Sequence, residues 1–358
     1  MNIALLNFPF DNNYGGNLQR YALMKVLEEM GHEVTHLYTC YAWSLPGRNK
    51  YVTLAKRVIN RVIRRRNDSL YPEYKTEYFN HKHSYVVKRF YDRYVKHTAP
   101  ITPYDDFRMY NNFDAYIVGS DQVWRRSMSG WFPYPRMFFD FVRDRTNVKR
   151  ISYGVSFGNT TDELSDNEKN YIGELYKLFT ATSVREDSGL ALLSRYGWTS
   201  PQAIQVLDPT LLLSREHYIE LIERGRTKQS EGNLFCYVLD KTPEIVSTID
   251  RISDEKHLKP FEVSLEYDNM VTVEQWLRSF LDAEYIVTDS YHGFVFSMIF
   301  HKPVKLTYNT RRGNERFESI MRMTGYNPEN GTPDWEKLER IMNIERKKSK
   351  EFLINALK

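Results

Sequence analysis

The chain has 358 residues, of which 41% are hydrophobic and 27% are charged, and its formal net charge is +4. This length exceeds the roughly 250–300 residues at which one hydrophobic core usually stops growing, so we expect two domains. The composition excludes a largely disordered chain, and no run of about 18 apolar residues predicts a transmembrane helix.

The first part of the chain predicts a βαβ unit. The apolar run IALLNF (3–8) is typical of a buried parallel strand, and no basic region precedes it that would indicate a signal peptide. Apolar residues at helical spacing follow over 17–31, and strand character returns in HEVTHLY (32–38). Residues 51–110 are rich in Lys, Arg and Tyr, and they predict a helical basic insertion.

Strands and helices then alternate to the end of the chain. Strands are predicted at 113–118, 150–157, 181–184, 203–207, 233–240, 261–265, 284–289 and 303–308, and helices at 166–180, 187–196, 244–256, 273–281 and 291–300. The last predicted helix is amphipathic and runs from Asp334, a plausible N-cap, to Leu357.

This order predicts an α/β fold with two Rossmann-like, doubly wound domains facing a cleft. The N-terminal domain is expected at 1–205 and the C-terminal domain at 206–333. A C-terminal helix at 334–358 is predicted to pack back on the N-terminal domain. Ligands of such folds bind beyond the carboxyl ends of the strands, so the residues that follow each strand are the candidate site.

Two strand ends in the N-terminal domain carry glycines and polar residues. After the first strand come four candidate substrate-binding residues, Asn13, Tyr14, Gly15 and Gly16. Glycines at a helix start let backbone N–H groups approach an anion, although a simple tight turn explains the pair equally well. After the strand 113–118 come Ser120, Asp121, Gln122 and Trp124, which suit a sugar unless Asp121 only caps the next helix.

Three further strand ends supply charge and proton-transfer groups. Ser156 lies among small residues, and Arg185 stands where a guanidinium can grip phosphate or carboxylate unless it forms a structural ion pair. After the strand 284–289 come Asp289, Ser290, Tyr291, His292 and Gly293, at the start of an apolar helix. That helix start directs N–H groups and a positive dipole into the cleft, where His292 can bind an anion or move a proton. The alternative is a buried histidine of the core.

At these residues the sequence resembles the polysaccharide pyruvyltransferase family. The matching segments occur in family order: NYGGNLQRYAL (13–23), YIVGSDQVW (116–124), SYGVSFG (152–158), SVREDSG (183–189), VLDPTLLL (206–213) and 272–304. The resemblance implies a GT-B-like fold and an active site between the domains. It implies transfer of the enolpyruvyl unit of phosphoenolpyruvate to sugar hydroxyls of a bacterial surface-polysaccharide precursor, forming a pyruvate ketal and releasing phosphate.

The resemblance also implies where the donor binds. Arg185 and the segment 290–292 would hold its carboxylate and phosphate. Some members of the family have Arg and Leu at the positions of Ser290 and Tyr291 in this chain. The family usually has Asn at the position of Arg125. The missing guanidinium predicts a substitute cation, for which the candidates are Arg311, Arg312 and Arg316.

The chemistry requires an acid, a base and fixed cations for two anionic groups. His292 is the candidate for acid or phosphate ligand, Asp121 or Asp289 for the base, and Arg185 for the anion clamp. No metal or cofactor is expected besides the donor, and the histidines show no metal-ligand spacing. The alternatives are a GT-B glycosyltransferase that uses a nucleotide sugar, suggested by the spacing of Glu266 and Glu274, or a non-catalytic glycan-binding protein.

Residues 54–66 (LAKRVINRVIRRR) predict a cationic amphipathic helix with Leu54, Val58 and Val62 on its apolar face. Such a helix can lie on an anionic membrane, where a lipid-linked oligosaccharide acceptor would be reached, or it can pack its apolar face on the core. Two distant cysteines without a CxxC pair fit a cytoplasmic protein, peripheral at the inner face of the membrane in the first case. Nucleic acid is not expected, because the net charge is small and no reading motif is present.

Overall fold

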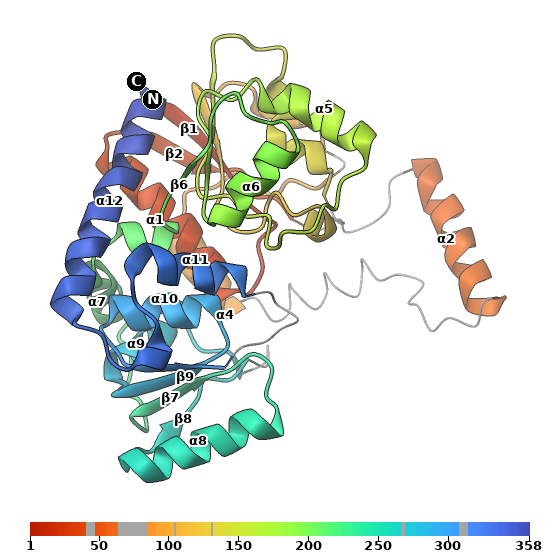
Figure 1. Ribbon diagram of the computed structural model, residues 1–358. Helices are drawn as coiled ribbons and strands as arrows, with labels where there is room; N and C mark the ends of the chain where they lie inside the picture. The colour runs from red at the N-terminus through yellow and green to blue at the C-terminus, as the bar shows by residue number, and fades with distance from the viewer. Residues whose placement is uncertain (41–46, 64–84, 104, 130–131, 266–268, 308–313) are drawn as a thin grey trace.

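The computed structural model describes residues 1–40, 47–63, 85–103, 105–129, 132–265, 269–307 and 314–358. The chain forms two parallel β-sheets with helices packed around them, so the α/β architecture is as the sequence predicts (Figure 1).

The N-terminal half is built on a parallel sheet in the order β2-β1-β3-β4. Its strands are β1 (Asn2–Leu6), β2 (Glu33–His36), β3 (Ala115–Val118) and β4 (Lys149–Ser152). A short pair, β5 (Ser183–Val184) and β6 (Ile204–Gln205), extends the sheet, because bridges join Ile151 to Ala181 and Val155 to Val184. The helices of this half are α1 (Tyr14–Glu29), α2 (Gly47–Val62), α4 (Tyr85–Tyr94), α5 (Asp166–Tyr176) and α6 (Asp187–Arg195).

The C-terminal half repeats the plan with a parallel sheet in the order β10-β9-β7-β8. Its strands are β7 (Leu234–Tyr237), β8 (Pro260–Phe261), β9 (Tyr285–Thr288) and β10 (Val304–Leu306). Its helices are α7 (Arg215–Arg224), α8 (Pro243–Lys256), α9 (Val273–Asp282), α10 (Tyr291–Ile299) and α11 (Glu315–Thr324). Short 3₁₀ helices are η1 (Phe107–Tyr110), η2 (Arg126–Ser129), η3 (Tyr134–Phe138), η4 (Asp140–Val142), η5 (Pro209–Leu212) and η8 (Pro328–Asn330).

One hydrophobic core joins the two halves. It runs from Ile3 and Leu18 through Leu211 to Trp276 and Phe294 without interruption. A second core covers the other face of the N-terminal sheet, and a third, smaller one lies between the C-terminal sheet and α8. Because buried apolar contacts cross between the halves, the two sheets hold the residues between them in a fixed arrangement.

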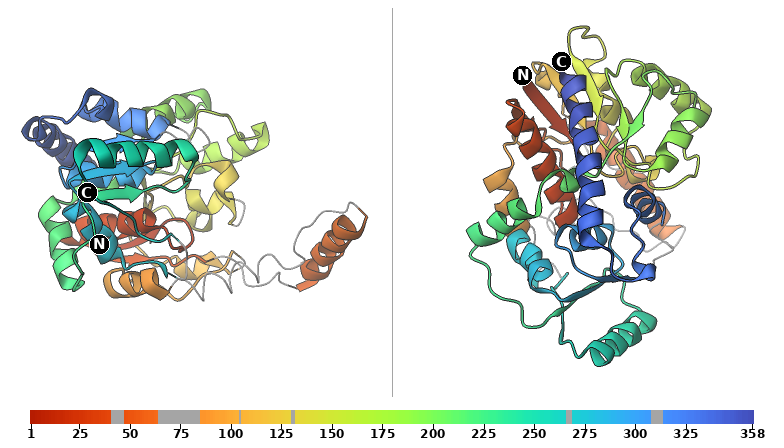
Figure 2. Two further views of the ribbon diagram at one scale, coloured as in Figure 1. Left: turned by 90° about the horizontal axis from the view of Figure 1, so that it is seen from below. Right: turned by 60° about the vertical axis from the view of Figure 1, so that its left-hand side comes forward.

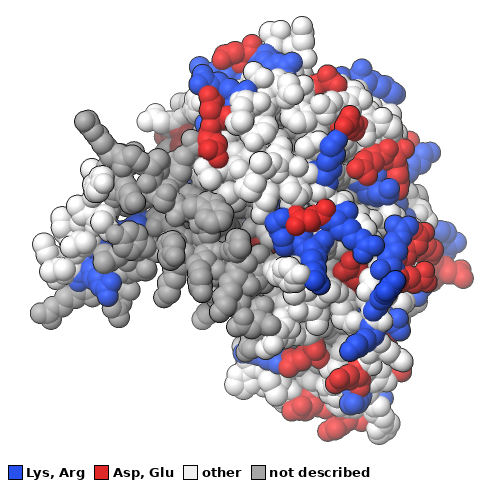
Figure 3. Space-filling model, turned by 180° about the vertical axis from the view of Figure 1, so that it is seen from behind, with Lys and Arg blue, Asp and Glu red and all other residues white. Residues whose placement is uncertain are grey.

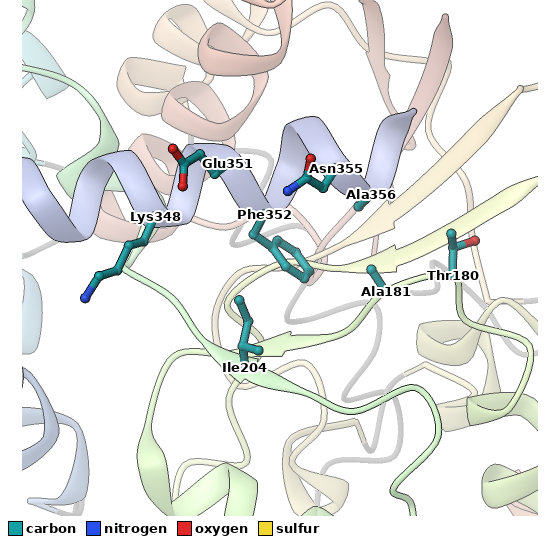
Figure 4. Close-up of a pocket in the computed structure, with 8 residues that line it drawn as sticks. All are labelled: Thr180, Ala181, Ile204, Lys348, Glu351, Phe352, Asn355 and Ala356. Atoms are coloured by element: carbon teal, nitrogen blue, oxygen red, sulfur yellow. The ribbon is translucent and has the colours of Figure 1, made fainter.

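The last helix, α12 (Trp335–Leu357), runs along both halves (Figure 2, right). Arg346 donates a hydrogen bond to the Leu211 carbonyl (2.9 Å), and Ser349 accepts one from the Leu207 N–H (3.0 Å). Nearer its end, Phe352 lies 6.3 Å from the Tyr153 ring. Figure 4 shows Phe352 pointing toward the strands of the N-terminal half, beside an open pocket of about 410 Å³.

The region predicted as a helical insertion, 51–110, is not one helical unit. Helix α4 belongs to the core, because Phe90 and Tyr91 are buried against α1 and α9. After α4 the chain is extended, and His97 and Ile101 pair with the end of β2 and the residues beyond it. The helical prediction is therefore wrong for that part, whereas 64–84 lie outside the described residues.

Candidate active site

Arg185 occupies the centre of a buried cluster of charged side chains at the carboxyl end of β5. Its Nη1 donates to Asp208 Oδ2 (2.8 Å), its Nη2 lies 3.6 Å from Asp121 Oδ1, and its Nε lies 3.6 Å from Glu186 Oε1. The side chain is almost fully buried. Among the described groups, Nε and Nη2 have no hydrogen-bond partner, so two donors of the guanidinium remain for a ligand.

Asp208 fixes the position of this guanidinium. Its Oδ2 also accepts from Gln19 Nε2 (2.6 Å), and its Oδ1 accepts from the backbone N–H and hydroxyl of Thr210 (3.0 and 2.7 Å). Burial alone would raise the pKa of Asp208, but Arg185 and His292 outweigh burial and hold that pKa below its usual range. At neutral pH an ionised carboxylate therefore faces Arg185 and orients one edge of its guanidinium.

Tyr291, in the first turn of α10, contacts Arg185 and a second cation of the site, Arg316. Its ring lies 4.7 Å from the Arg185 guanidinium and 5.4 Å from that of Arg316, on α11. Burial lowers the pKa of Arg316, and the charge of Arg185 lowers it further. Arg316 Nε is buried and has no hydrogen-bond partner among the described residues. Two guanidiniums at one tyrosine ring, each with unused donors, favour the binding of an anion. Arg311 and Arg312 lie outside the described residues.

His292 lies next to this pair in the same helical turn. Its Nε2 is 3.9 Å from Asp208 Oδ2 and has no hydrogen-bond partner in the described structure. The ring rests against Gly15 at the start of α1, where an added Cβ would come within 2.0 Å of Nδ1. Burial lowers the pKa of His292 to about 4, although Asp208 works against that shift. At neutral pH the imidazole is uncharged, which favours a ligand role over that of a general acid.

Glu186 was not among the predicted site residues, yet it is part of the cluster. Its Oε1 accepts a hydrogen bond from the hydroxyl of Ser156, and its Oε2 is buried with no partner in the described structure. Burial raises the pKa of Glu186, and the opposing effect of Arg185 does not cancel this shift. The residue lies in the SVREDSG segment, so its place beside Arg185 at a strand end was the available signal.

Several other predicted residues build the helix starts that frame the site. Asn13 caps α1 by accepting from the Gly16 N–H (3.1 Å), and Ser290 caps α10 by accepting from the Gly293 N–H (3.3 Å). Gly293 itself permits close packing, because a Cβ there would meet Thr288 Oγ1 at 2.1 Å. These residues therefore shape the two helix N-termini.

Asp289 holds the loop after β7. Its two carboxylate oxygens accept from the backbone N–H groups of Leu239 (2.7 Å) and Asp240 (3.0 Å). Asp121, in contrast, lies beside Arg185 and is partly exposed. The geometry thus favours Asp121 over Asp289 as the base.

The remaining predicted residues lie inside the fold, where Tyr14 also links the two halves. Tyr14 is buried, stacks on Trp276 of the other half (5.2 Å) and donates to the Val271 carbonyl (2.9 Å). Trp124, predicted to face a sugar, lies in the core instead, stacked on Phe138 at 4.8 Å, so its faces are not open to a ligand.

Ser120 and Gln122 also make internal hydrogen bonds. The hydroxyl of Ser120 donates to the Gly154 carbonyl (3.0 Å), and Gln122 Oε1 accepts from Arg125 (2.9 Å). Across the described residues, no group of three or more His, Cys, Asp or Glu side chains is placed to hold a metal ion.

Two parallel α/β halves that face each other across this cluster form a GT-B-like fold. The N-terminal half supplies Asp121, Arg185 and Glu186, and the C-terminal half supplies Tyr291, His292 and Arg316. The chain belongs to the polysaccharide pyruvyl transferase family, whose model matches residues 13–305.

Solved structures of other proteins match nearly the whole chain at low sequence identity. The chain is similar to the UDP-GlcNAc 2-epimerase from Neisseria meningitidis bound to UDP-GlcNAc, with 10% identity over 100% of this chain and 99% of that chain and a TM-score of 0.49. It is similar to the UDP-N-acetylglucosamine 2-epimerase from Rickettsia bellii, with 9% identity over 100% and 97% of the chains and a TM-score of 0.44. An alpha-glucosyltransferase in complex with UDP and DNA matches at 10% identity over 99% and 95%, with a TM-score of 0.44. No curated protein matches the sequence.

Proposed function

We propose that this transferase uses phosphoenolpyruvate as its donor. It would place the enolpyruvyl unit on two hydroxyls of a sugar in a bacterial surface-polysaccharide precursor, forming a pyruvate ketal and releasing phosphate. The observation that supports this most is the pair of guanidiniums, Arg185 and Arg316, over the Tyr291 ring, with unused N–H donors beside a neutral His292. Phosphoenolpyruvate carries two anionic groups close together, so it suits two fixed cations.

The proposed binding mode follows from how these donors are held. Asp208 fixes one edge of the Arg185 fork, and the free edge would bind the carboxylate or a phosphate oxygen of the donor. Arg316 would take the place of the guanidinium that this chain lacks at Ser290. His292 Nε2 would donate a hydrogen bond to phosphate in the neutral tautomer that carries its proton there.

Glu186 is the better candidate for the acid. Its raised pKa favours a protonated carboxyl, and its unpartnered Oε2 can carry the proton. In the proposed reaction Glu186 protonates the methylene carbon of the donor, and a sugar hydroxyl attacks the adjacent carbon and passes its proton to Asp121. The bond from that carbon to the phosphate oxygen then breaks, and phosphate leaves with the proton that Asp121 took up. The second hydroxyl closes the ketal and returns its proton to Glu186. One proton is gained by carbon and one leaves with phosphate, so the two hydroxyl protons balance the reaction.

The direct assay incubates the protein with phosphoenolpyruvate and a panel of lipid-linked glycans. The proposal predicts phosphate release that depends on an acceptor, and a product with a new methyl group that carries deuterium when the reaction runs in D₂O. No phosphate release with any glycan, together with turnover of a UDP-sugar, would instead support the nucleotide-sugar glycosyltransferase. Of the two glutamates behind that alternative, Glu266 lies outside the described residues, and Glu274 is buried in α9 against Gly225.

The acid assignment is tested with Glu186→Gln, which keeps the size of the side chain but cannot deliver the proton. We expect kcat to fall by about 10²–10⁴-fold with little change in the donor KM. Asp187→Asn is the matched control, because the neighbouring Asp187 pairs with Arg322 on α11, outside the cluster. A Glu186→Gln enzyme with unchanged kcat would return the acid role to another residue.

The described helices include none that is long and apolar enough to cross a membrane. We propose a cytoplasmic location on chemical grounds, because the donor is a metabolite of that compartment.

A further inference from the structure

Helix α2 extends from the body of the molecule, and its apolar side chains face solvent. Figure 1 and the left view of Figure 2 both draw it to one side of the two sheets. Val58 and Ile59 are 41% and 49% exposed, and Val62 and Ile63 at its end are 71% and 73% exposed. These four residues recur at i and i+4, so they form one stripe along the helix. Of the two sequence interpretations, packing of this face on the core is therefore wrong.

The charge of α2 is of one sign. Its sequence, GRNKYVTLAKRVINRV, contains five Lys or Arg residues and no Asp or Glu. Lys56 and Arg61 are exposed on the helix. On the back of the body, basic and acidic side chains are intermixed (Figure 3). Helix α2 thus combines an uncovered apolar stripe with an unbalanced positive charge.

We propose that α2 docks on an anionic lipid surface, with the apolar stripe in the boundary between headgroups and acyl chains. Both features of the helix are satisfied by this occupant, because lipid chains cover the stripe and anionic headgroups neutralise the basic side chains. A second copy of α2 would cover the stripe but would bring like charges together. Nucleic acid would neutralise the charge but would leave the stripe in water. The inference does not depend on the proposed donor or reaction.

The test uses the full chain in cosedimentation with vesicles of phosphatidylcholine alone and of phosphatidylcholine mixed with phosphatidylglycerol. We expect binding to the mixed vesicles only, and weaker binding as salt is added. The variant Lys56→Gln/Arg61→Gln should lose affinity by about tenfold or more, since each basic residue near an anionic surface adds to the attraction. The control Lys347→Gln/Lys348→Gln changes the charge by the same amount on exposed residues of α12 and should bind like the unmodified chain.

A second variant isolates the apolar stripe. Val62→Ser/Ile63→Ser leaves the charge unchanged and should also reduce binding to the mixed vesicles by about tenfold. Circular dichroism and thermal unfolding of each variant show whether it is folded. Absence of binding to the mixed vesicles at low salt would overturn the proposal. So would binding that both α2 variants retain, or a dimer in sedimentation velocity that the serine variant abolishes.

Discussion

Helices α1 and α10 begin in the same way but do different things. Each follows a parallel strand of its own half, each is capped by a polar side chain, and each is largely buried. The first turn of α1 carries Tyr14 into the opposite half, where it stacks on Trp276. The first turn of α10 carries Tyr291 and His292 into the charged cluster around Arg185.

The two helix starts meet where Gly15 lies against the His292 ring. The start of α1 therefore serves as a joint between the two halves, whereas the start of α10 supplies side chains to the charged cluster. A small residue in the joint leaves room for the functional side chain opposite. Apart from Gly15, which touches His292, substitutions in the two turns should therefore have separable effects, on stability for α1 and on activity for α10.

The largest effect is expected where α10 meets Arg185. Arg185→Lys keeps the charge but loses the planar fork that Asp208 orients and that lies over Tyr291. We expect donor kcat/KM to fall by about 10²-fold or more, measured by phosphate release. Arg322→Lys is the control, because that arginine pairs with Asp187 at the half-exposed surface of α11. A donor KM like that of the unmodified enzyme in Arg185→Lys would remove it from the donor site.

The next effect tests the contact between the two helix starts. Gly15→Ala places a Cβ about 2.0 Å from His292 Nδ1, so the ring must move. A displacement of this size predicts a loss of about 10–10²-fold in kcat/KM. Gly16→Ala is the matched control, since its Cβ meets no atom nearer than 3.6 Å. It should keep activity and stabilise the helix by about 0.5–1 kcal/mol, visible as a higher Tm. Full activity in Gly15→Ala would separate α1 from the site.

The pH dependence of stability tests whether His292 is buried in its uncharged form. Burial lowers its pKa from 6.5 to about 4, so between these values the unfolded chain binds a proton that the folded chain does not. The contribution of His292 to the free energy of unfolding is therefore complete above pH 6.5. It decreases by up to about 3 kcal/mol as the pH falls toward 4. Urea unfolding across that range should show a smaller decrease in His292→Gln. Burial also lowers the pKa values of His36 and His217, so part of the pH dependence of stability should remain in this variant.

The smallest effect is expected in the joint. Tyr14→Phe removes the hydrogen bond to the Val271 carbonyl but keeps the stacking on Trp276. It should cost about 1 kcal/mol of stability in urea unfolding and leave kcat/KM unchanged. A large loss of activity in Tyr14→Phe would show that the start of α1 takes part in the chemistry, and the contrast between the two helices would fail.

Much of the fold could be predicted, because apolar runs and helical spacing are local signals. Strands β3 and β9 begin and end close to the predicted positions, whereas β4 ends at Ser152 and not at the predicted residue 157. Helices α7 and α11 were missed, since only a few apolar residues such as Leu221 and Phe317 mark their buried sides.

The direction of a side chain at a strand end is harder to predict, because it depends on distant partners. Trp124 and Arg185 follow strands in similar ways, yet one enters the core and the other the site. Asp208 stands in the segment VLDPTLLL, which was recognised only for its resemblance. Its importance comes from Gln19 and Arg185, which lie 189 and 23 residues away in the chain.

The path of α12 has a consequence for the order in which the protein is made. Its Ser349 binds the Leu207 N–H across 142 residues of sequence, and its end lies beside the N-terminus (Figure 1). During synthesis the first half leaves the ribosome long before this helix exists. The edge formed by Tyr153 and Leu207 therefore stays uncovered until α12 emerges, and the N-terminal half completes its packing only after the C-terminal half has been made.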